Sequence, residues 1–139
     1  MGIRYRVHVE KKIVFVAWKG VISAEEWFVH IQRLIADSHW PSITAMLVNL
    51  HSITDVSSIG EAEIKHAIAL FNSIPEALSN KRIAAVASDA FWKSRRFGQL
   101  IAPYGPSVLV FNDMSTACIY LGIKLTDAAK AIQQLRDDQ

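Results

Sequence analysis

Apolar, strand-length segments alternate with stretches of helical periodicity along this chain, and this alternation limits the fold more than any other feature. Three such segments are apolar on both sides, namely Ile13–Trp18, Ile43–Leu50 and Arg82–Ala87, and Ser107–Phe111 is a shorter fourth. Strands that are apolar on both sides are typical of a parallel sheet covered by helices on each face. Strands that alternate with helices are joined by right-handed crossovers. The pattern therefore predicts an α/β fold with a mostly parallel sheet.

The first segment of the chain predicts a further strand. Residues 3–9 alternate between apolar and polar side chains, and the polar stretch Glu10–Lys12 follows them. This alternation is typical of a half-buried strand. We expect an N-terminal β-hairpin in which the second strand lies deeper in the sheet. The whole chain is then one domain, residues 1–139, with a mixed five-stranded sheet and residues 124–139 as a C-terminal helical extension.

Capping residues mark where the helices begin. Ser23–Glu26 and Ser58–Glu61 have the spacing of capping boxes, and Asn112–Asp113 and Ser88–Asp89 are further helix starts. Helix ends are predicted before Pro75, because proline disfavours helix in the preceding residue, and at other turn residues. The last helix, residues 126–136, has Ala129, Ile132 and Leu135 on one side. We expect this stripe either to cap the sheet or to form a homodimer with a second copy.

Composition excludes several functions. The 15 basic and 13 acidic residues give a net charge of +2, too small for an electrostatic nucleic-acid partner. No window of the sequence predicts a transmembrane segment or a signal peptide. The single cysteine, Cys118, cannot form an internal disulfide and is typical of a cytoplasmic protein. The apolar fraction of 51% is high, which indicates either a complete core or apolar surface for a partner, ligand or second copy.

The sequence lacks the common catalytic and metal-binding motifs. The five histidines lack metal-ligand spacing, and we find no nucleophile triad, carboxylate pair or glycine-rich phosphate loop. We therefore predict no catalytic residue, no metal and no cofactor, and we expect that the protein is not an enzyme.

Four short motifs resemble one known family. They are Gly20 followed by Ile22–Glu26, the strand end Leu47–Leu50 with the Thr54–Asp55 loop, the strand Arg82–Asp89, and Val108–Asp113 followed by Ala117 and Tyr120–Leu121. Together they resemble the STAS-like (SpoIIAA-like) family, which is related to anti-sigma-factor antagonist domains and is compared with SEC14-type lipid-binding domains. The resemblance covers about residues 3–123. It implies the same α/β fold and a regulatory or protein-interaction role.

The resemblance also implies a phosphorylation site. Antagonists of this family carry a phosphorylated serine at the start of the helix after the central strand, within an Asp-Ser-Ser/Thr-Gly pattern. Here Thr54, Asp55, Ser57 and Ser58 occupy that region, although the Asp and Gly positions are displaced and Asn49 replaces the usual strand aspartate. A helix N-terminus tolerates a phosphate because its N–H groups are unpaired. The alternative is that Ser58 only caps the helix.

A basic and aromatic segment gives the second candidate site. Trp92, Lys93, Arg95 and Arg96 lie together on one predicted helix and are candidates for contact with a ligand or an anion. The alternative is a solvated helix face over a packed one. Trp18, Trp27 and Trp40 either line a pocket or belong to the core. The leading hypothesis is thus a regulatory module with a protein partner, and the alternative is a SEC14-like carrier or sensor of a small apolar or lipid-like ligand.

Overall fold

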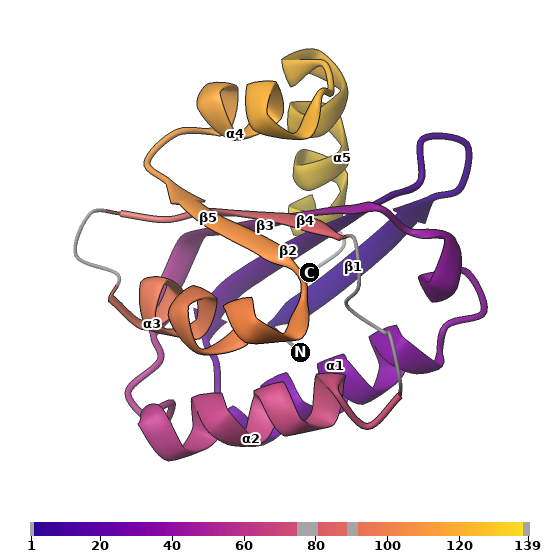
Figure 1. Ribbon diagram of the computed structural model, residues 1–139. Coiled ribbons are helices and arrows are strands. Elements are labelled where there is room, and N and C mark those ends of the chain that lie inside the picture. The colour runs from indigo at the N-terminus through magenta and orange to yellow at the C-terminus, as the bar shows by residue number, and fades with distance from the viewer. Residues whose placement is uncertain (1, 75–80, 89–91, 138–139) are drawn as a thin grey trace.

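Figure 1 shows the computed structural model, in which a five-stranded sheet lies between two layers of helices. The structure describes residues 2–74, 81–88 and 92–137. In chain order, its elements are β1 (Ile3–His8), β2 (Ile13–Val21), α1 (Ala24–Ala36), the 3-10 turn η1 (Trp40–Ser42), β3 (Ala45–Asp55), α2 (Glu61–Phe71), β4 (Arg82–Val86), α3 (Trp92–Ile101), the 3-10 turn η2 (Ala102–Tyr104), β5 (Ser107–Phe111), α4 (Met114–Leu121) and α5 (Leu125–Asp137).

The sheet is mixed and follows the order of the chain, β1-β2-β3-β4-β5. Strands β1 and β2 are antiparallel, with Ile3 opposite Trp18, and all later neighbours are parallel. Six consecutive residues of β2 are buried, so the second strand of the hairpin is the deeper one, as expected. The predicted α/β class, the N-terminal hairpin and the five-stranded mixed sheet are confirmed.

The distribution of the helices follows from the strand order. Strands β2 to β5 are added in one direction across the sheet, and right-handed crossovers then bring every connecting helix to the same face. Helices α1, α2 and α3 accordingly lie below the sheet in Figure 1, and α4 and α5 lie above it. Because both faces of the parallel strands are apolar, the second face also needs a cover, which the two last helices supply.

The last helix packs on its own sheet. Ala128, Ala131, Ile132 and Leu135 of α5 are buried in the cluster that includes Ile13 of β2. Ile132 and Leu135 of the expected stripe are buried, whereas Ala129 is exposed, because the buried face continues through Ala128 and Ala131 instead. The stripe on which the homodimer expectation depended is therefore occupied within the chain.

Two strands extend further than the sequence pattern indicates. We expected β2 to end before Gly20 and β3 to end at Leu50, with a polar loop after it. Instead, β2 continues to Val21 and β3 to Asp55, with Lys19 opposite Ser52 and register shifts beside it. The pattern missed this extension because the added residues are exposed or half-buried and therefore have no apolar run to mark them.

Candidate functional site

An apolar cavity of about 90 Å³ lies between the sheet and helices α1, α2 and α3. It is partly open to the surface. Its floor consists of side chains from β2, β3, β4 and β5, and its walls come from the three helices and from the segment between β3 and α2. The lining residues are Val16, Trp18, Trp27, His30, Leu34, Met46, Val48, Leu50, Val56, Ile59, Ile64, Phe71, Ile83, Ala85, Lys93, Ser94, Phe97 and Val108.

Aromatic rings form much of the cavity wall. Trp27 of α1 lies between Trp18 of β2 and Phe97 of α3, with ring centroids 5.8 Å apart in both pairs. Phe71 of α2 extends this row of rings, and its ring centroid lies 6.2 Å from that of Phe97. Aromatic rings at these separations and inclinations pack favourably. The sequence leaves open whether the tryptophans line a pocket or belong to the core, and in the structure Trp18 and Trp27 line the cavity.

Trp40 does not line this cavity. Its ring stacks on Phe71, and the ammonium of Lys81 lies 4.4 Å from the ring centroid. Lys81 is buried and donates hydrogen bonds to the backbone carbonyls of Trp40 and Ile43, at 2.9 and 2.5 Å. Burial lowers the pKa of Lys81. Sequence reasoning overlooked this residue, whose role is to hold η1 against the start of β4.

The few polar groups of the cavity come from separate elements. The indole Nε1–H of Trp18 is buried and has no hydrogen-bond partner within the part of the chain that the structure describes. His30 of α1 is 9% exposed, and burial, helped by the charge of Arg33, lowers its pKa to about 4. The imidazole is therefore neutral at pH 7. Lys93 and Ser94 are neighbours on α3 and lie at the cavity wall.

The basic residues of α3 make different contacts. Lys93 donates a hydrogen bond from Nζ to the backbone carbonyl of Val56, at 2.5 Å. Arg96 forms an ion pair with Glu61 of α2, and this hydrogen bond lowers the pKa of Glu61. Arg95 is exposed. Trp92 begins α3, but its side chain lies outside the described part of the structure, so that candidate stays a prediction.

The serine segment lies directly beside the cavity. Thr54 and Asp55 end β3, and the backbone N–H and hydroxyl of Ser57 both donate to the Asp55 carboxylate, at 2.8 and 3.2 Å. These residues line a shallow groove of about 340 Å³ together with Ser88. Val56 lines both the groove and the cavity, and its carbonyl accepts the Lys93 bond. The structure thus joins two candidate sites that the sequence analysis treated separately.

Ser58 has a different role from the one that its capping-box spacing indicated. Helix α2 begins at Glu61 with Gly60 as its N-cap, and Glu63 completes the cap by accepting the Gly60 backbone N–H at 2.9 Å. The predicted capping box of Ser58 and Glu61 is therefore wrong. The Ser58 hydroxyl instead accepts a hydrogen bond from the backbone N–H of Ala24, at 3.0 Å, so it lies at the N-terminus of α1. Tertiary contact, which spacing cannot reveal, decides this position.

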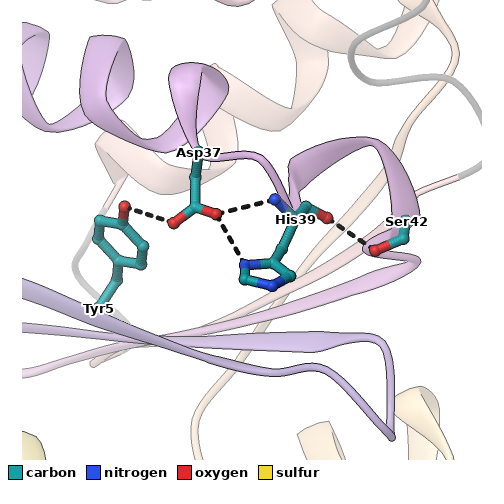
Figure 2. A network of polar contacts seen from close by, with 4 residues as sticks. All are labelled: Tyr5, Asp37, His39 and Ser42. Carbon is teal, nitrogen blue, oxygen red and sulfur yellow. Dashed lines mark hydrogen bonds and ion pairs between the residues drawn. The ribbon is translucent and has the colours of Figure 1, made fainter.

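A polar network behind the cavity was missed by the sequence analysis. Figure 2 shows the Tyr5 hydroxyl donating to the Asp37 carboxylate at 2.9 Å, while the backbone N–H of His39 donates to the other carboxylate oxygen at the same distance. The Ser42 hydroxyl in turn donates to the His39 carbonyl. Burial and the bond to Asp37 raise the pKa of Tyr5 to about 12, and the His39 N–H lowers that of Asp37. The network fastens the end of α1 to β1.

Tyr5 also lines a groove of about 270 Å³ between β1 and α1, and His30 borders this groove as well as the cavity. Within the described residues, no three His, Cys, Asp or Glu side chains come close enough to hold a metal ion. Burial raises the pKa of the Cys118 thiol, which makes it less reactive. No described helix is long and apolar enough to cross a lipid bilayer.

Comparison with known proteins gives a likeness of structure and none of sequence. No family model matches the chain, and no curated protein matches it by sequence. A solved structure of the anti-sigma-factor antagonist SpoIIAA in its unphosphorylated form is similar, with a TM-score of 0.47 and 11% identity over 85% of this chain and 94% of that one. The likeness concerns the arrangement of strands and helices.

Proposed function

We propose that this chain is a non-enzymatic regulatory module that senses or carries a small apolar ligand in the cavity under α1, α2 and α3. The observation that carries the proposal is an apolar cavity lined by Trp18, whose buried indole N–H has no hydrogen-bond partner among the described residues. Buried polar groups are nearly always hydrogen-bonded, so an orphaned donor at a cavity is the kind of group that a ligand or an ordered water completes.

The size of the cavity limits the ligand. An engineered apolar cavity of roughly 150 Å³ binds benzene, and one water needs about 10–15 Å³ of the same measure. A volume of about 90 Å³ lies between these values and suits a short alkyl chain rather than a flat polycyclic molecule. The partly open mouth allows the remainder of a longer molecule to extend outward.

The link between Lys93 and Val56 supports a sensing role. A ligand that moves the α3 wall changes the hydrogen bond to the Val56 carbonyl, and Val56 is directly followed by Ser57 and Ser58. A contact of this kind carries a signal only if the ligand binds two conformations of the wall with different affinity. We place the module in the cytoplasm, which agrees with its single buried, free cysteine.

Native mass spectrometry and thermal unfolding test the ligand proposal. We expect protein purified under gentle conditions to retain a small apolar molecule, or the emptied protein to unfold at higher temperature as hexan-1-ol is added, because binding to the folded state stabilises it. Ala85→Leu fills the cavity and should remove the effect, whereas the exposed Ile119→Ala should keep it. A protein that is empty and does not respond to hexan-1-ol contradicts the proposal.

A second candidate function is a phosphorylation-controlled contact with a protein partner through Thr54, Asp55, Ser57 and Ser58. The supporting observation is the Ser58 hydroxyl at the N-terminus of α1, where N–H groups and the helix dipole favour a phosphate. Ser57 suits a phosphate less well, because its hydroxyl lies 3.2 Å from the Asp55 carboxylate.

Phosphopeptide mapping of protein from its native cells tests this candidate. We expect phosphate on Ser58 rather than Ser57, and we expect Ser58→Asp to change binding to a partner while Ser58→Ala keeps it. If Ser57 and Ser58 are not phosphorylated and both variants bind the partner equally, this candidate function is contradicted. Sedimentation of the same samples also tests the homodimer expectation, since a monomer at all concentrations removes it.

A further inference from the structure

The indole of Trp18 is a polar group of the cavity lining that the fold leaves unsatisfied. Trp18 is 7% exposed, and its buried Nε1–H has no hydrogen-bond partner among the described residues. A buried donor without an acceptor destabilises a fold, so proteins nearly always satisfy such a group with protein, water or ligand atoms. An acceptor from outside the described part of the chain is therefore needed to complete this site.

The strand pairing beside Trp18 is irregular. Ala17 of β2 pairs with Asn49 of β3, and the next recorded pair is Lys19 with Ser52. Strand β3 therefore places two residues opposite Trp18, which is the geometry of a β-bulge. Bulges redirect side chains and are frequent beside active and binding sites. The bulge lies at the residue that brings the unsatisfied N–H to the cavity lining.

Trp40 provides an internal comparison. Its indole N–H is also buried without a partner among the described residues, but Trp40 does not line the cavity. Its ring is instead covered by Phe71 and by the ammonium group of Lys81. The two indoles share the unsatisfied donor and differ in their position relative to the cavity, so a ligand in the cavity should affect Trp18 alone.

The remaining lining residues favour a ligand without charge. Apart from His30, Lys93 and Ser94, the described lining residues are apolar, and none is Asp or Glu. The imidazole of His30 is neutral at pH 7, because burial lowers its pKa to about 4. Lys93 donates to the Val56 carbonyl and has a further interaction, so its ammonium group is not a free counter-charge. An ionised group would lose its hydration in this cavity without a charge to replace it.

We infer that the ligand is a small neutral molecule with an alkyl chain and a carbonyl oxygen, that of a ketone or an ester, which accepts a hydrogen bond from the Trp18 N–H. This inference rests on the proposed function, because it names the ligand class of the same cavity. A carbonyl oxygen brings no donor of its own, so a single N–H satisfies it among apolar side chains. A cavity of about 90 Å³ with a partly open mouth accommodates a chain of a few carbons.

Nuclear magnetic resonance of the indole N–H groups tests the contact directly. The emptied full-length protein, labelled with nitrogen-15, should give one indole signal for each of its four tryptophans, and Trp18→Phe and Trp40→Phe assign two of them. The probes are pentan-2-one and 2-methylpent-1-ene, which have the same shape but differ in having a carbonyl oxygen or a CH₂ group. We expect pentan-2-one to move the Trp18 proton signal downfield, because a hydrogen bond forms. The Trp40 signal should stay, and 2-methylpent-1-ene should bind without the downfield shift.

Binding to the variants measures the strength of the contact. Trp18→Phe removes the N–H and should weaken the binding of pentan-2-one relative to 2-methylpent-1-ene by about 5-fold, as expected for one neutral hydrogen bond. The ratio cancels the change in cavity volume, because the two probes have the same shape. Trp40→Phe removes the other unsatisfied N–H and should leave the ratio unchanged. Thermal unfolding checks that both variants are folded, and the spectra of the wild type decide if Trp18→Phe does not fold.

The outcomes separate this inference from the proposed function. If the probes bind but the Trp18 signal does not move downfield, or if Trp18→Phe leaves the ratio unchanged, the carbonyl contact is overturned and the apolar cavity remains a binding site. If neither probe binds and hexan-1-ol has no effect, both are overturned. Binding that survives Ala85→Leu shows that the probes occupy another place and likewise overturns both.

Discussion

The two faces of the sheet bury side chains of different size. On the face covered by α4 and α5, the cluster contains many alanines, among them Ala84, Ala117 and Ala131. On the face covered by α1, α2 and α3, three tryptophans and Phe71 lie in the core, and the cavity lies among these side chains. The cavity therefore lies on the face with the large rings and not among the alanines.

The difference indicates that the two faces of the sheet have different roles. The face with α4 and α5 gives the domain a dense core. The other face has the cavity, a buried histidine and the helix that carries the basic residues. Variants on the two faces should therefore behave differently.

Ile132→Ala tests whether α5 belongs to the dense core. Ile132 is 2% exposed, and truncation of a buried isoleucine to alanine costs about 2–5 kcal/mol of the free energy of unfolding. Urea unfolding measures the change. Gln133→Ala, an exposed neighbour on the same helix, should stay within about 0.5 kcal/mol of the wild type. Equal stability of the two variants means that α5 does not cover the sheet.

Acid should weaken the cavity face through His30. The pKa of His30 is about 4 in the folded protein and about 6.5 when unfolded, so below pH 6.5 the unfolded chain binds the additional proton. The stabilisation is complete above pH 6.5 and decreases as the pH falls to 4, by about 3 kcal/mol.

The measurement compares urea unfolding at pH 7 and pH 4 in two variants. His30→Gln should lose much less stability over this range than the wild type, because it no longer titrates. His66→Gln changes an exposed histidine and should retain the wild-type dependence. If His30→Gln and the wild type respond equally to acid, the buried neutral imidazole is not the cause.

Ala84 and Ala85 provide the sharpest contrast, because adjacent residues of β4 face opposite sides of the sheet. Ala84→Leu should destabilise the protein by about 1–3 kcal/mol, since the dense face has no room for the added methyl groups. Ala85→Leu enters the cavity and should change stability by less than about 1 kcal/mol. Thermal or urea unfolding measures the stability of both variants. If Ala85→Leu destabilises the protein more than Ala84→Leu does, the free space does not lie on the face of Ala85.

The serine contact at the start of α1 should give the smallest effect. Ser58→Ala removes the acceptor for the Ala24 N–H and should cost about 0.5–1 kcal/mol. Ser57→Ala breaks only an exposed bond to Asp55 and should be nearly neutral. Equal effects in urea unfolding would indicate that Ser58 does not cap α1.

Local sequence signals predicted several helix starts and ends of this molecule well. Ser23 caps α1, since its hydroxyl accepts the Glu26 N–H, and Asp113 caps α4 in the same way. Gly122 ends α4 with a φ of 73°, which is a conformation that glycine adopts without strain. These contacts lie within a few residues, so the local sequence contains both partners. The predicted capping box of Ser58 failed because the partner of Ser58 is 34 residues away in the sequence.

The candidate site could be predicted only in part for the same reason. The basic residues of α3 and the serine segment are both visible in the sequence, but only the fold brings Lys93 to the Val56 carbonyl and shows that Arg96 pairs with Glu61. In the predicted stripe of α5 only Ala129 was wrong, because the adjacent Ala128, which is the buried residue, fits the periodicity equally well.

By itself, the sequence determined the α/β class, the hairpin and the order of the elements, because hydrophobic periodicity and caps act between near neighbours along the chain. Only the tertiary structure decided where the large aromatic side chains leave space and which polar groups border it. The cavity is lined by side chains from four strands and three helices, which are far apart in the sequence. The distances between these side chains are fixed only when the helices pack on the sheet.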